Sequence, residues 1–111
     1  MPATRNLLAG VEFRKMKRQP LIVNTARGGL VDEVDLVAAL DDGKVSGIGF
    51  DVLTTEPPSH EHPLMKVADR PNVIITPHVA WASFEAQTEC WRQTVDHVNA
   101  FFEGQAKNMV T

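Results

Sequence analysis

The apolar residues of this chain fall into short runs separated by prolines, glycines and charged residues. Two runs are continuous and rich in branched side chains, at residues 21–23 and 73–76, and another run spans residues 45–52. Continuous runs of this length are typical of strands that are buried on both faces, as in a parallel sheet. They predict three strands. Gly47 and Gly49 are expected to allow close approach of a neighbouring group.

Helical patterns alternate with these runs. A short amphipathic stretch at residues 7–17 precedes the first strand. Asp32 is a natural N-cap for a second helix, and Gly43 is a natural residue just beyond its end. Ser83 caps a last helix that reaches about residue 103. One face of this helix is apolar, so we expect its Cys90 and Trp91 to be buried; the face comprises Ala86, Cys90, Trp91, Thr94, Val95, Val98, Phe101 and Phe102.

The resulting order is helix, strand, helix, strand, loop, strand, helix, which indicates an α/β fold with right-handed crossovers and parallel strands. Three strands are few for such a sheet, so we expect residues 1–111 to form a single partial domain. The loop at residues 54–70 holds three prolines. Within it, residues 60–62 (His-Glu-His) are expected to be solvated rather than to bind a metal.

Composition excludes several classes of protein. The chain has 111 residues, of which 43% are hydrophobic, and a net charge of −3. These values indicate a globular chain of one domain at most and argue against nucleic-acid binding. No apolar run approaches the roughly 18 residues of a membrane span. A single cysteine excludes a disulfide framework, and the first residues show no hydrophobic signal region. We therefore expect a cytoplasmic protein with no membrane partner.

Candidate chemistry gathers at one edge of the predicted sheet, because ligands of parallel α/β sheets bind beyond the carboxyl ends of the strands. Arg27 follows the first strand, Asp51 and Glu56 follow the second, and His78 follows the third. A carboxylate beside an imidazole favours the imidazolium, which is a general acid. The fork of donors on Arg27 suits a carboxylate. Together these groups fit reduction of a 2-keto acid.

Each of these residues also has a purely structural interpretation. Glu56 fits a solvated loop carboxylate, and His78 fits a loop histidine at a strand end. Arg27 fits a surface residue that pairs with Asp32. Spacing alone leaves these alternatives open.

Three motifs resemble the D-isomer-specific 2-hydroxyacid dehydrogenases. Residues 21–33 read Leu-Ile-Val-Asn-Thr-Ala-Arg-Gly-Gly-Leu-Val-Asp-Glu, residues 49–52 read Gly-Phe-Asp-Val before Glu56 and a proline, and residues 72–78 read Asn-Val-Ile-Ile-Thr-Pro-His. The motifs keep the family's order and spacing over nearly the whole chain. Residues 51–58 and 78–83 most resemble the glycerate dehydrogenase (hydroxypyruvate reductase) branch.

The resemblance implies a role for each matched residue. Arg27 corresponds to the substrate-orienting arginine, His78 to the acid/base, and Glu56 to its carboxylate partner. The cofactor, NAD or NADP, is expected to contact Thr25, Ala26, Arg27, Asp51, His78, Val79, Ala80 and Trp81. Asp51 corresponds to the residue that hydrogen-bonds the nicotinamide carboxamide. No metal is implied, and the substrate is a small 2-keto or 2-hydroxy acid.

The family's pattern is only partly present. Members have over 300 residues in two domains, whereas this sequence contains no Gly-x-Gly-x-x-Gly turn. The resemblance therefore implies part of a Rossmann-like parallel sheet, the second half of a nucleotide-binding domain, with residues 103–111 as a tail toward a substrate domain. We expect the chain alone to be inactive, and a homodimer to form through this domain. The alternative is a non-catalytic α/β module that serves association.

Overall fold

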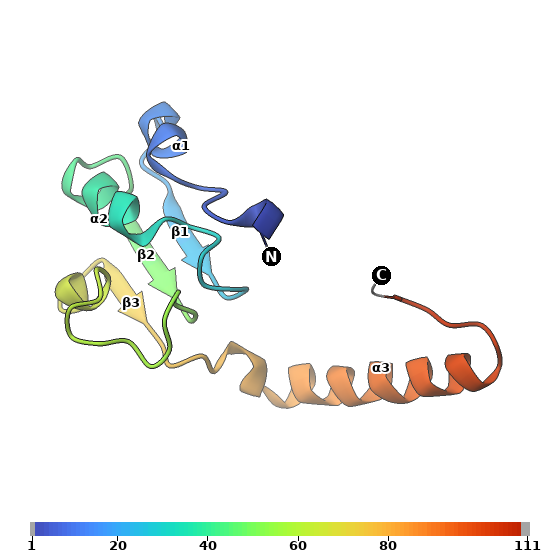
Figure 1. Cartoon of the computed structure of the whole chain (residues 1–111). Helices are drawn as coiled ribbons and strands as arrows, with labels where there is room; N and C mark the ends of the chain where they lie inside the picture. Colours follow the sequence, from blue (N-terminus) through green and yellow to red (C-terminus); the bar gives the residue numbers. More distant parts are fainter. Residues whose placement is uncertain (1, 110–111) are drawn as a thin grey trace. The chain divides into compact units, whose positions relative to one another are not determined.

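The computed structural model describes residues 2–109, which divide after His78 into two compact units that we describe separately. The first unit contains a three-stranded parallel sheet of β1 (Leu21–Asn24), β2 (Gly47–Phe50) and β3 (Val73–Ile75). The strands lie in chain order, β1-β2-β3 (Figure 1). The predicted α/β class with three parallel strands is confirmed.

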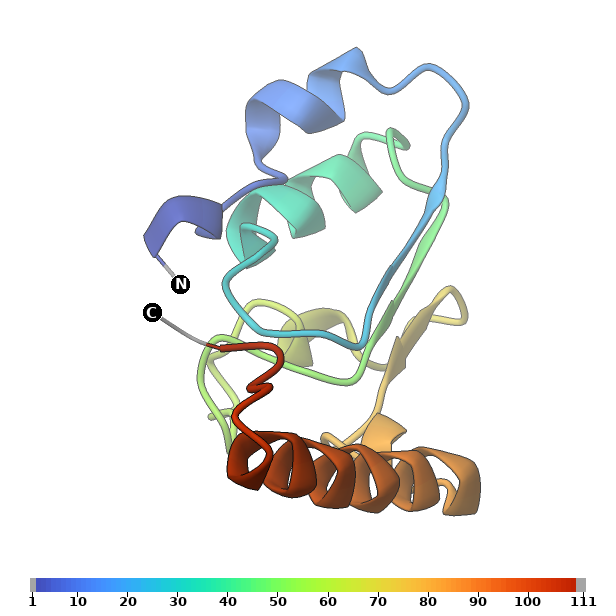
Figure 2. The ribbon, with the colours of Figure 1, turned by 90° about the vertical axis from the view of Figure 1, so that its right-hand side faces the viewer.

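Two helices cover one face of this sheet (Figures 1 and 2). The helix α1 (Gly10–Lys15) is shorter than the predicted 7–17 stretch, and it packs against α2 (Glu33–Asp41). Short 3₁₀ turns η1 (Pro2–Thr4) and η2 (Met65–Val67) complete the unit. The long loop therefore contains a single helical turn and is otherwise irregular, as its prolines predict.

The ends of α2 follow from its capping residues. The side chain of Asp32 accepts hydrogen bonds from the backbone N–H groups of Val34 (3.1 Å) and Asp35 (3.0 Å), so it satisfies two N–H groups of the first turn. Gly43 has a φ of +65°, the left-handed conformation that favours glycine just beyond a helix. Both predicted signals are confirmed.

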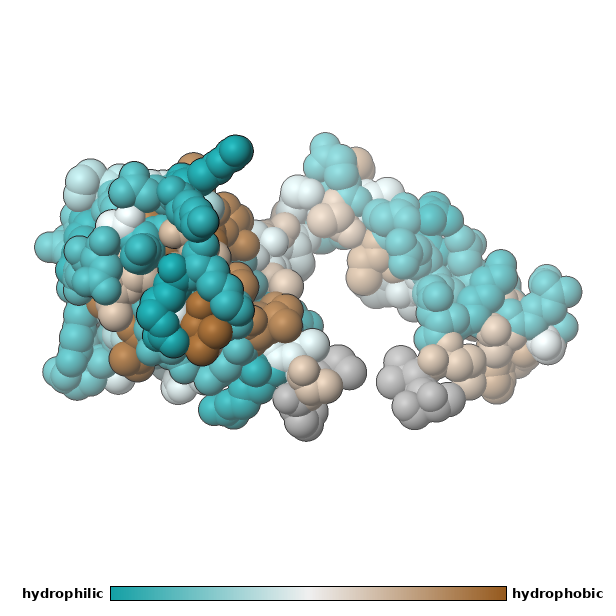
Figure 3. Space-filling model, turned by 90° about the horizontal axis from the view of Figure 1, so that it is seen from above, coloured by the Kyte–Doolittle hydropathy of each residue, from teal (hydrophilic) through white to brown (hydrophobic). Residues whose placement is uncertain are grey.

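The prediction that the strands are buried on both faces is wrong. Leu21 and Val23 are each 71% exposed and Ile74 is 65% exposed. Strand register puts these side chains on one face, while Ile48 and Phe50 on the opposite face are buried in the core. Within residues 2–78, the helices cover only that second face. Seen from above, brown hydrophobic patches are visible on this unit (Figure 3).

The two strand glycines differ in how closely their neighbours approach. A β-carbon at Gly47 would lie 2.8 Å from the backbone oxygen of Asn72, so close approach is real there. At Gly49 the nearest atom would be a methyl of Val23 at 3.7 Å, an ordinary contact. Of these two strand glycines, therefore, only Gly47 is required by packing.

The second unit consists of the 3₁₀ turn η3 (Ala80–Ala82) and the long helix α3 (Phe84–Phe102). Ser83 caps α3 as predicted, with its hydroxyl accepting from the N–H of Ala86 at 3.1 Å. Cys90 is exposed and Trp91 is 71% exposed, so the prediction that they are buried is wrong. Within its unit α3 has no second layer of secondary structure against which to bury a face.

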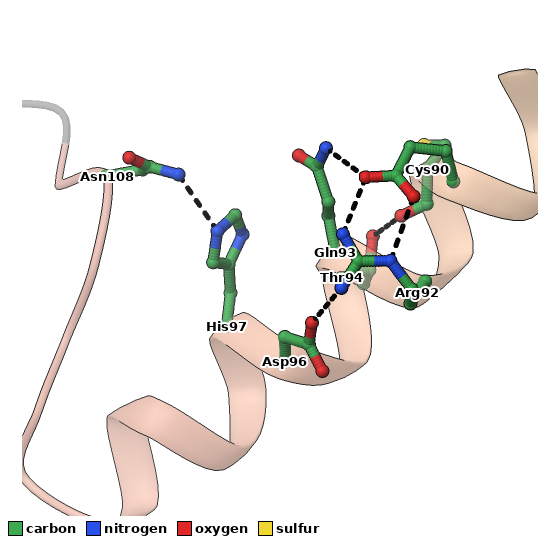
Figure 4. A network of polar contacts seen from close by, with 8 residues as sticks. Cys90, Arg92, Gln93, Thr94, Asp96, His97 and Asn108 are labelled. Carbon is green, nitrogen blue, oxygen red and sulfur yellow. Dashed lines mark hydrogen bonds and ion pairs between the residues drawn. The ribbon is translucent and has the colours of Figure 1, made fainter.

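Charged side chains stabilise the polar side of α3 (Figure 4). Arg92 forms ion pairs with Glu89 (2.6 Å) and Asp96 (2.5 Å), one turn away on either side. Hydrogen bonding to the Arg92 guanidinium lowers the pKa of Glu89 to about 2. Asn108 reaches back to His97 at 3.0 Å. No helix within residues 2–109 combines the length and the apolarity that crossing a bilayer demands.

Candidate functional site

The turn after β1 is folded by a buried amide. Asn24 is 6% exposed, and its Oδ1 accepts from the N–H of Ala26 (3.1 Å) while its Nδ2 donates to the carbonyl of Arg27 (2.9 Å). Thr25, Ala26 and Arg27 are consequently exposed at the carboxyl end of the strand. The Arg27 guanidinium donates to the Ala26 carbonyl at 2.7 Å.

Arg27 borders a pocket of about 560 Å³ at this end of the first unit. A second arginine, Arg5, lines the same pocket. Two arginines in the lining of one pocket favour an anionic ligand. The remaining lining residues are Thr4, Gly28, Gly29, Leu30 and Thr54.

Asp51 connects the ends of all three strands. It is 4% exposed, its backbone N–H donates to the Asn24 carbonyl at 3.0 Å, and its carboxylate accepts from the Thr76 hydroxyl at 2.6 Å. The Asp51 carboxylate is therefore a buried acceptor at the carboxyl edge of the sheet.

Glu56 and His78 form a direct pair. Glu56 Oε2 lies 2.7 Å from Nδ1 of His78, and Glu56 Oε1 accepts from the N–H of Leu53 at 2.8 Å. The two side chains are 36% and 42% exposed, so the pair is open to solvent. His78 has a φ of +54°, an uncommon conformation for a residue other than glycine. Residues 22 positions apart therefore meet at the sheet edge.

The Glu56 contacts predict a pH dependence. Donation from the Leu53 N–H, and after it the bond to His78, holds the pKa of Glu56 below its usual value. The ionised form is therefore stabilised by folding, and this stabilisation is present above the usual pKa and lost as pH falls through the lowered one. We expect the Glu56 carboxyl carbon to titrate below its usual range in ¹³C NMR, and Glu56→Gln to lack this acid-side loss of stability. A normal Glu56 titration would contradict the pairing.

Gly28 brings the turn after β1 against the segment after β2. A β-carbon at Gly28 would lie 2.0 Å from the carbonyl oxygen of Leu53 and 2.5 Å from the nitrogen of Thr54. Only glycine allows this separation. The backbone next to Arg27 and the backbone that holds Glu56 are thereby fixed in direct contact.

The predicted solvated loop contains a buried histidine, which corrects the prediction for residues 60–62. His62 is 8% exposed, and its Nε2 lies 3.1 Å from Oε2 of Glu33, itself 8% exposed. The apolar Leu64 and Val67 belong to the core and draw the loop inward. No three His, Cys, Asp or Glu residues within 2–109 come together in an arrangement that would hold a metal.

The structure brings some predicted site residues together and leaves others apart. Glu56 contacts His78, and Asp51 lies at the same strand ends, whereas Arg27 lines a pocket to which Glu56 and His78 do not contribute. Val79, Ala80 and Trp81 belong to the second unit. Their proposed contacts with a cofactor remain predictions.

Sequence reasoning missed four residues that shape this edge. Three of them had a readable signal: an amide directly after a strand for Asn24, an Arg-Gly-Gly turn for Gly28, and an acidic first helical residue for Glu33. His62 had none, because only the fold shows that it reaches Glu33.

Comparison with known proteins places these features in a family. Residues 1–80 match the model of the D-isomer specific 2-hydroxyacid dehydrogenase NAD-binding domain. The chain is 50% identical over 109 residues to the glycerate dehydrogenase of Methylorubrum extorquens, covering 98% of this chain and 34% of that protein. It is 38% identical over 109 residues to the hydroxypyruvate reductase of Blautia hydrogenotrophica, covering 98% and 33%.

A solved structure agrees with this. The D-isomer specific 2-hydroxyacid dehydrogenase of Xanthobacter autotrophicus Py2, in complex with NADPH and MES, superposes with a TM-score of 0.79 at 31% identity, covering 100% of this chain and 44% of that one. The chain spans about a third of the length of the curated relatives named above. The chain belongs to the D-isomer specific 2-hydroxyacid dehydrogenase family, and its first 80 residues match the NAD-binding domain of that family.

Proposed function

We propose that this chain is the cofactor- and substrate-facing part of an oxidoreductase that reduces a small 2-keto acid to a D-2-hydroxy acid. The observation that carries the proposal is the 2.7 Å contact between Glu56 and His78 at the carboxyl edge of the sheet. This arrangement orients an imidazole by a carboxylate at the edge where α/β sheets bind their ligands. Arg27 on the neighbouring strand end supplies a cation for the substrate carboxylate.

Each residue has a defined part in the reaction. His78 gives a proton from Nε2 to the carbonyl oxygen of the substrate, since Nδ1 is engaged by Glu56. Glu56 holds the imidazole in orientation through the contact with Nδ1. Arg27 orients the substrate through its carboxylate. In the direction of oxidation, neutral His78 takes the proton back.

A nicotinamide cofactor fits the residues at this edge. The buried Asp51 is an acceptor suited to the nicotinamide carboxamide, and the exposed residues Thr25 and Ala26 lie at the neighbouring strand end. When bound, NAD or NADP supplies the hydride that adds to the carbonyl carbon. We also assign Val79, Ala80 and Trp81 to the cofactor wall by their place in the family motif. Similarity to glycerate dehydrogenase, hydroxypyruvate reductase and glyoxylate reductase supports hydroxypyruvate or glyoxylate as the substrate.

The chain alone is expected to turn over little or no substrate. It spans about a third of its relatives and contains no Gly-x-Gly-x-x-Gly turn to hold the pyrophosphate. The test is a chimera, in which residues of this chain replace the matched 109-residue segment of the Methylorubrum extorquens enzyme. We expect the chimera to reduce hydroxypyruvate with NADH or NADPH, and the isolated chain not to. A correctly folded but inactive chimera would reject the proposed function.

We further propose a homodimer formed through this domain and a cytoplasmic location. Exposed Leu21, Val23 and Ile74 on the sheet favour association, because apolar patches of this kind attract partners. The isolated chain is expected to associate as its concentration rises, measured by sedimentation velocity. A Val23→Lys variant serves as the control and should weaken association. A wild-type chain that stays monomeric at high concentration would count against the dimer, and also against a non-catalytic association module, the alternative function.

A further inference from the structure

A second pair of polar side chains, Glu33 and His62, is buried in the first unit and takes no part in the proposed reaction. Glu33 is the first residue of α2, and His62 comes from the loop between β2 and β3. We infer that Glu33 and His62 are positioning residues: they fix the Leu53–Thr54 backbone, and this backbone holds Glu56 against His78.

The hydrogen bonds define how the pair is built. Glu33 Oε1 accepts from the backbone N–H of Thr54 at 2.8 Å, while Glu33 Oε2 lies 3.1 Å from His62 Nε2. The backbone N–H of Leu64 donates to Nδ1 of His62 at 3.3 Å. Nδ1 therefore carries a lone pair, and the proton on Nε2 is donated to Glu33. Both oxygens of the carboxylate and both nitrogens of the ring are satisfied.

Two consecutive backbone amides connect this pair to the site. The N–H of Leu53 donates to Glu56, and the next N–H along the chain, that of Thr54, donates to Glu33. The Leu53 carbonyl is in turn held against Gly28. A displacement of this one segment would change the distance from the Leu53 N–H to Glu56, and with it the orientation of Glu56 toward His78.

The burial of Glu33 and His62 indicates that their contact has a role. Glu33 and His62 are each 8% exposed, and removing such groups from water is costly unless they are fully hydrogen-bonded. Apolar side chains of similar size commonly stabilise a core as well as a buried polar pair does. Unlike apolar side chains, a polar pair forms hydrogen bonds of defined direction. Here Glu33 accepts such a bond from the backbone N–H of Thr54.

The test measures the titration of Glu56 in the ¹³C-labelled chain, with His62→Ala and Glu33→Leu as variants, because leucine removes the oxygen that accepts from the Thr54 N–H. Donation from Leu53 is the largest cause of the lowered pKa of Glu56. Loss of the pair should therefore raise the pKa of Glu56 toward its usual value, while its other charged neighbours, His78 and Asp51, are unchanged. His62→Gln keeps an N–H donor for Glu33 and is expected to restore most of the wild-type titration.

The control variant is His60→Ala, which removes an exposed histidine from the same loop. It should leave the Glu56 titration unchanged. If His62→Ala and Glu33→Leu lower only the urea midpoint of unfolding and leave the Glu56 titration unchanged, the pair is structural and the inference is overturned. Should His62→Ala fail to fold, His62→Gln and Glu33→Leu decide the question: the pKa of Glu56 is expected to rise in Glu33→Leu, where the contribution of His78 remains, and to stay close to its wild-type value in His62→Gln.

Kinetics of the chimera give an independent measure, and this part rests on the proposed function. We expect His62→Ala to lower kcat about 10- to 100-fold, because small misplacements of positioned groups have effects of this order. In a Glu56→Gln background the same change should have little further effect, since both act through one carboxylate. Additive losses would overturn the positioning role. An inactive chimera would reject the proposed function and leave the NMR result to decide this inference.

Discussion

Replacing His78 with asparagine in the chimera is expected to lower the rate of keto-acid reduction by about 10²- to 10⁴-fold, the usual loss when a general acid is removed. Asparagine is the suitable replacement, because His78 has a φ of +54° and asparagine tolerates this conformation better than alanine does. The fold should therefore persist while the proton donor is lost. Steady-state kinetics with hydroxypyruvate measure the effect.

Two further variants show whether the loss of rate in His78→Asn comes from the loss of proton transfer. His97→Asn removes a histidine from α3 and should leave the rate unchanged. Arg27→Ala should raise KM as well as lower kcat, because it removes a binding cation rather than an acid. A His78→Asn chimera that reduces substrate at the wild-type rate would exclude His78 as the acid.

Gly28→Ala is expected to be strongly destabilising, by about 3 kcal/mol, the upper end of the range for overpacking. The new β-carbon would lie 2.0 Å from the Leu53 carbonyl oxygen, which is backbone and cannot rotate away. Urea unfolding of the chain measures the loss. Any folded fraction should also bind substrate poorly in the chimera, because Arg27 and the Leu53–Thr54 segment are forced apart.

The matched control is Gly49→Ala in β2. There the nearest atom would lie 3.7 Å away, so alanine fits and the change should have little effect on stability. Equal stability of the Gly28→Ala and wild-type chains would contradict the close contact between Gly28 and the Leu53 carbonyl.

Much of the fold was predictable, because its signals are local. The N-cap of α2 at Asp32, its left-handed Gly43 and the three apolar runs are properties of neighbouring residues. Burial was not predictable in the same way. An apolar run such as residues 21–23 indicates a strand, but whether both of its faces are covered depends on layers contributed by other segments.

The candidate site likewise has features that local sequence signals predict and features that they do not. Strand ends predict that Glu56 and His78 meet, since the edge of a parallel sheet gathers distant residues. The Glu33–His62 pair depends on a loop path that is set by burial of Leu64 and Val67, and no spacing rule describes such a path. Arg27 follows the strand-end rule, yet its guanidinium turns to its own backbone.

Glu33 contacts both ends of the segment between Thr54 and His62, one with each carboxylate oxygen. The segment is therefore a loop closed by a single side chain, and its tip at residues 59–61 is exposed. The entropy of closing such a loop grows only slowly with its length. A short peptide label inserted just before Ser59 leaves intact the turn in which the His62 N–H donates to the Ser59 carbonyl at 3.1 Å. It should therefore be tolerated without moving Glu56, which makes this position a suitable attachment point beside the site.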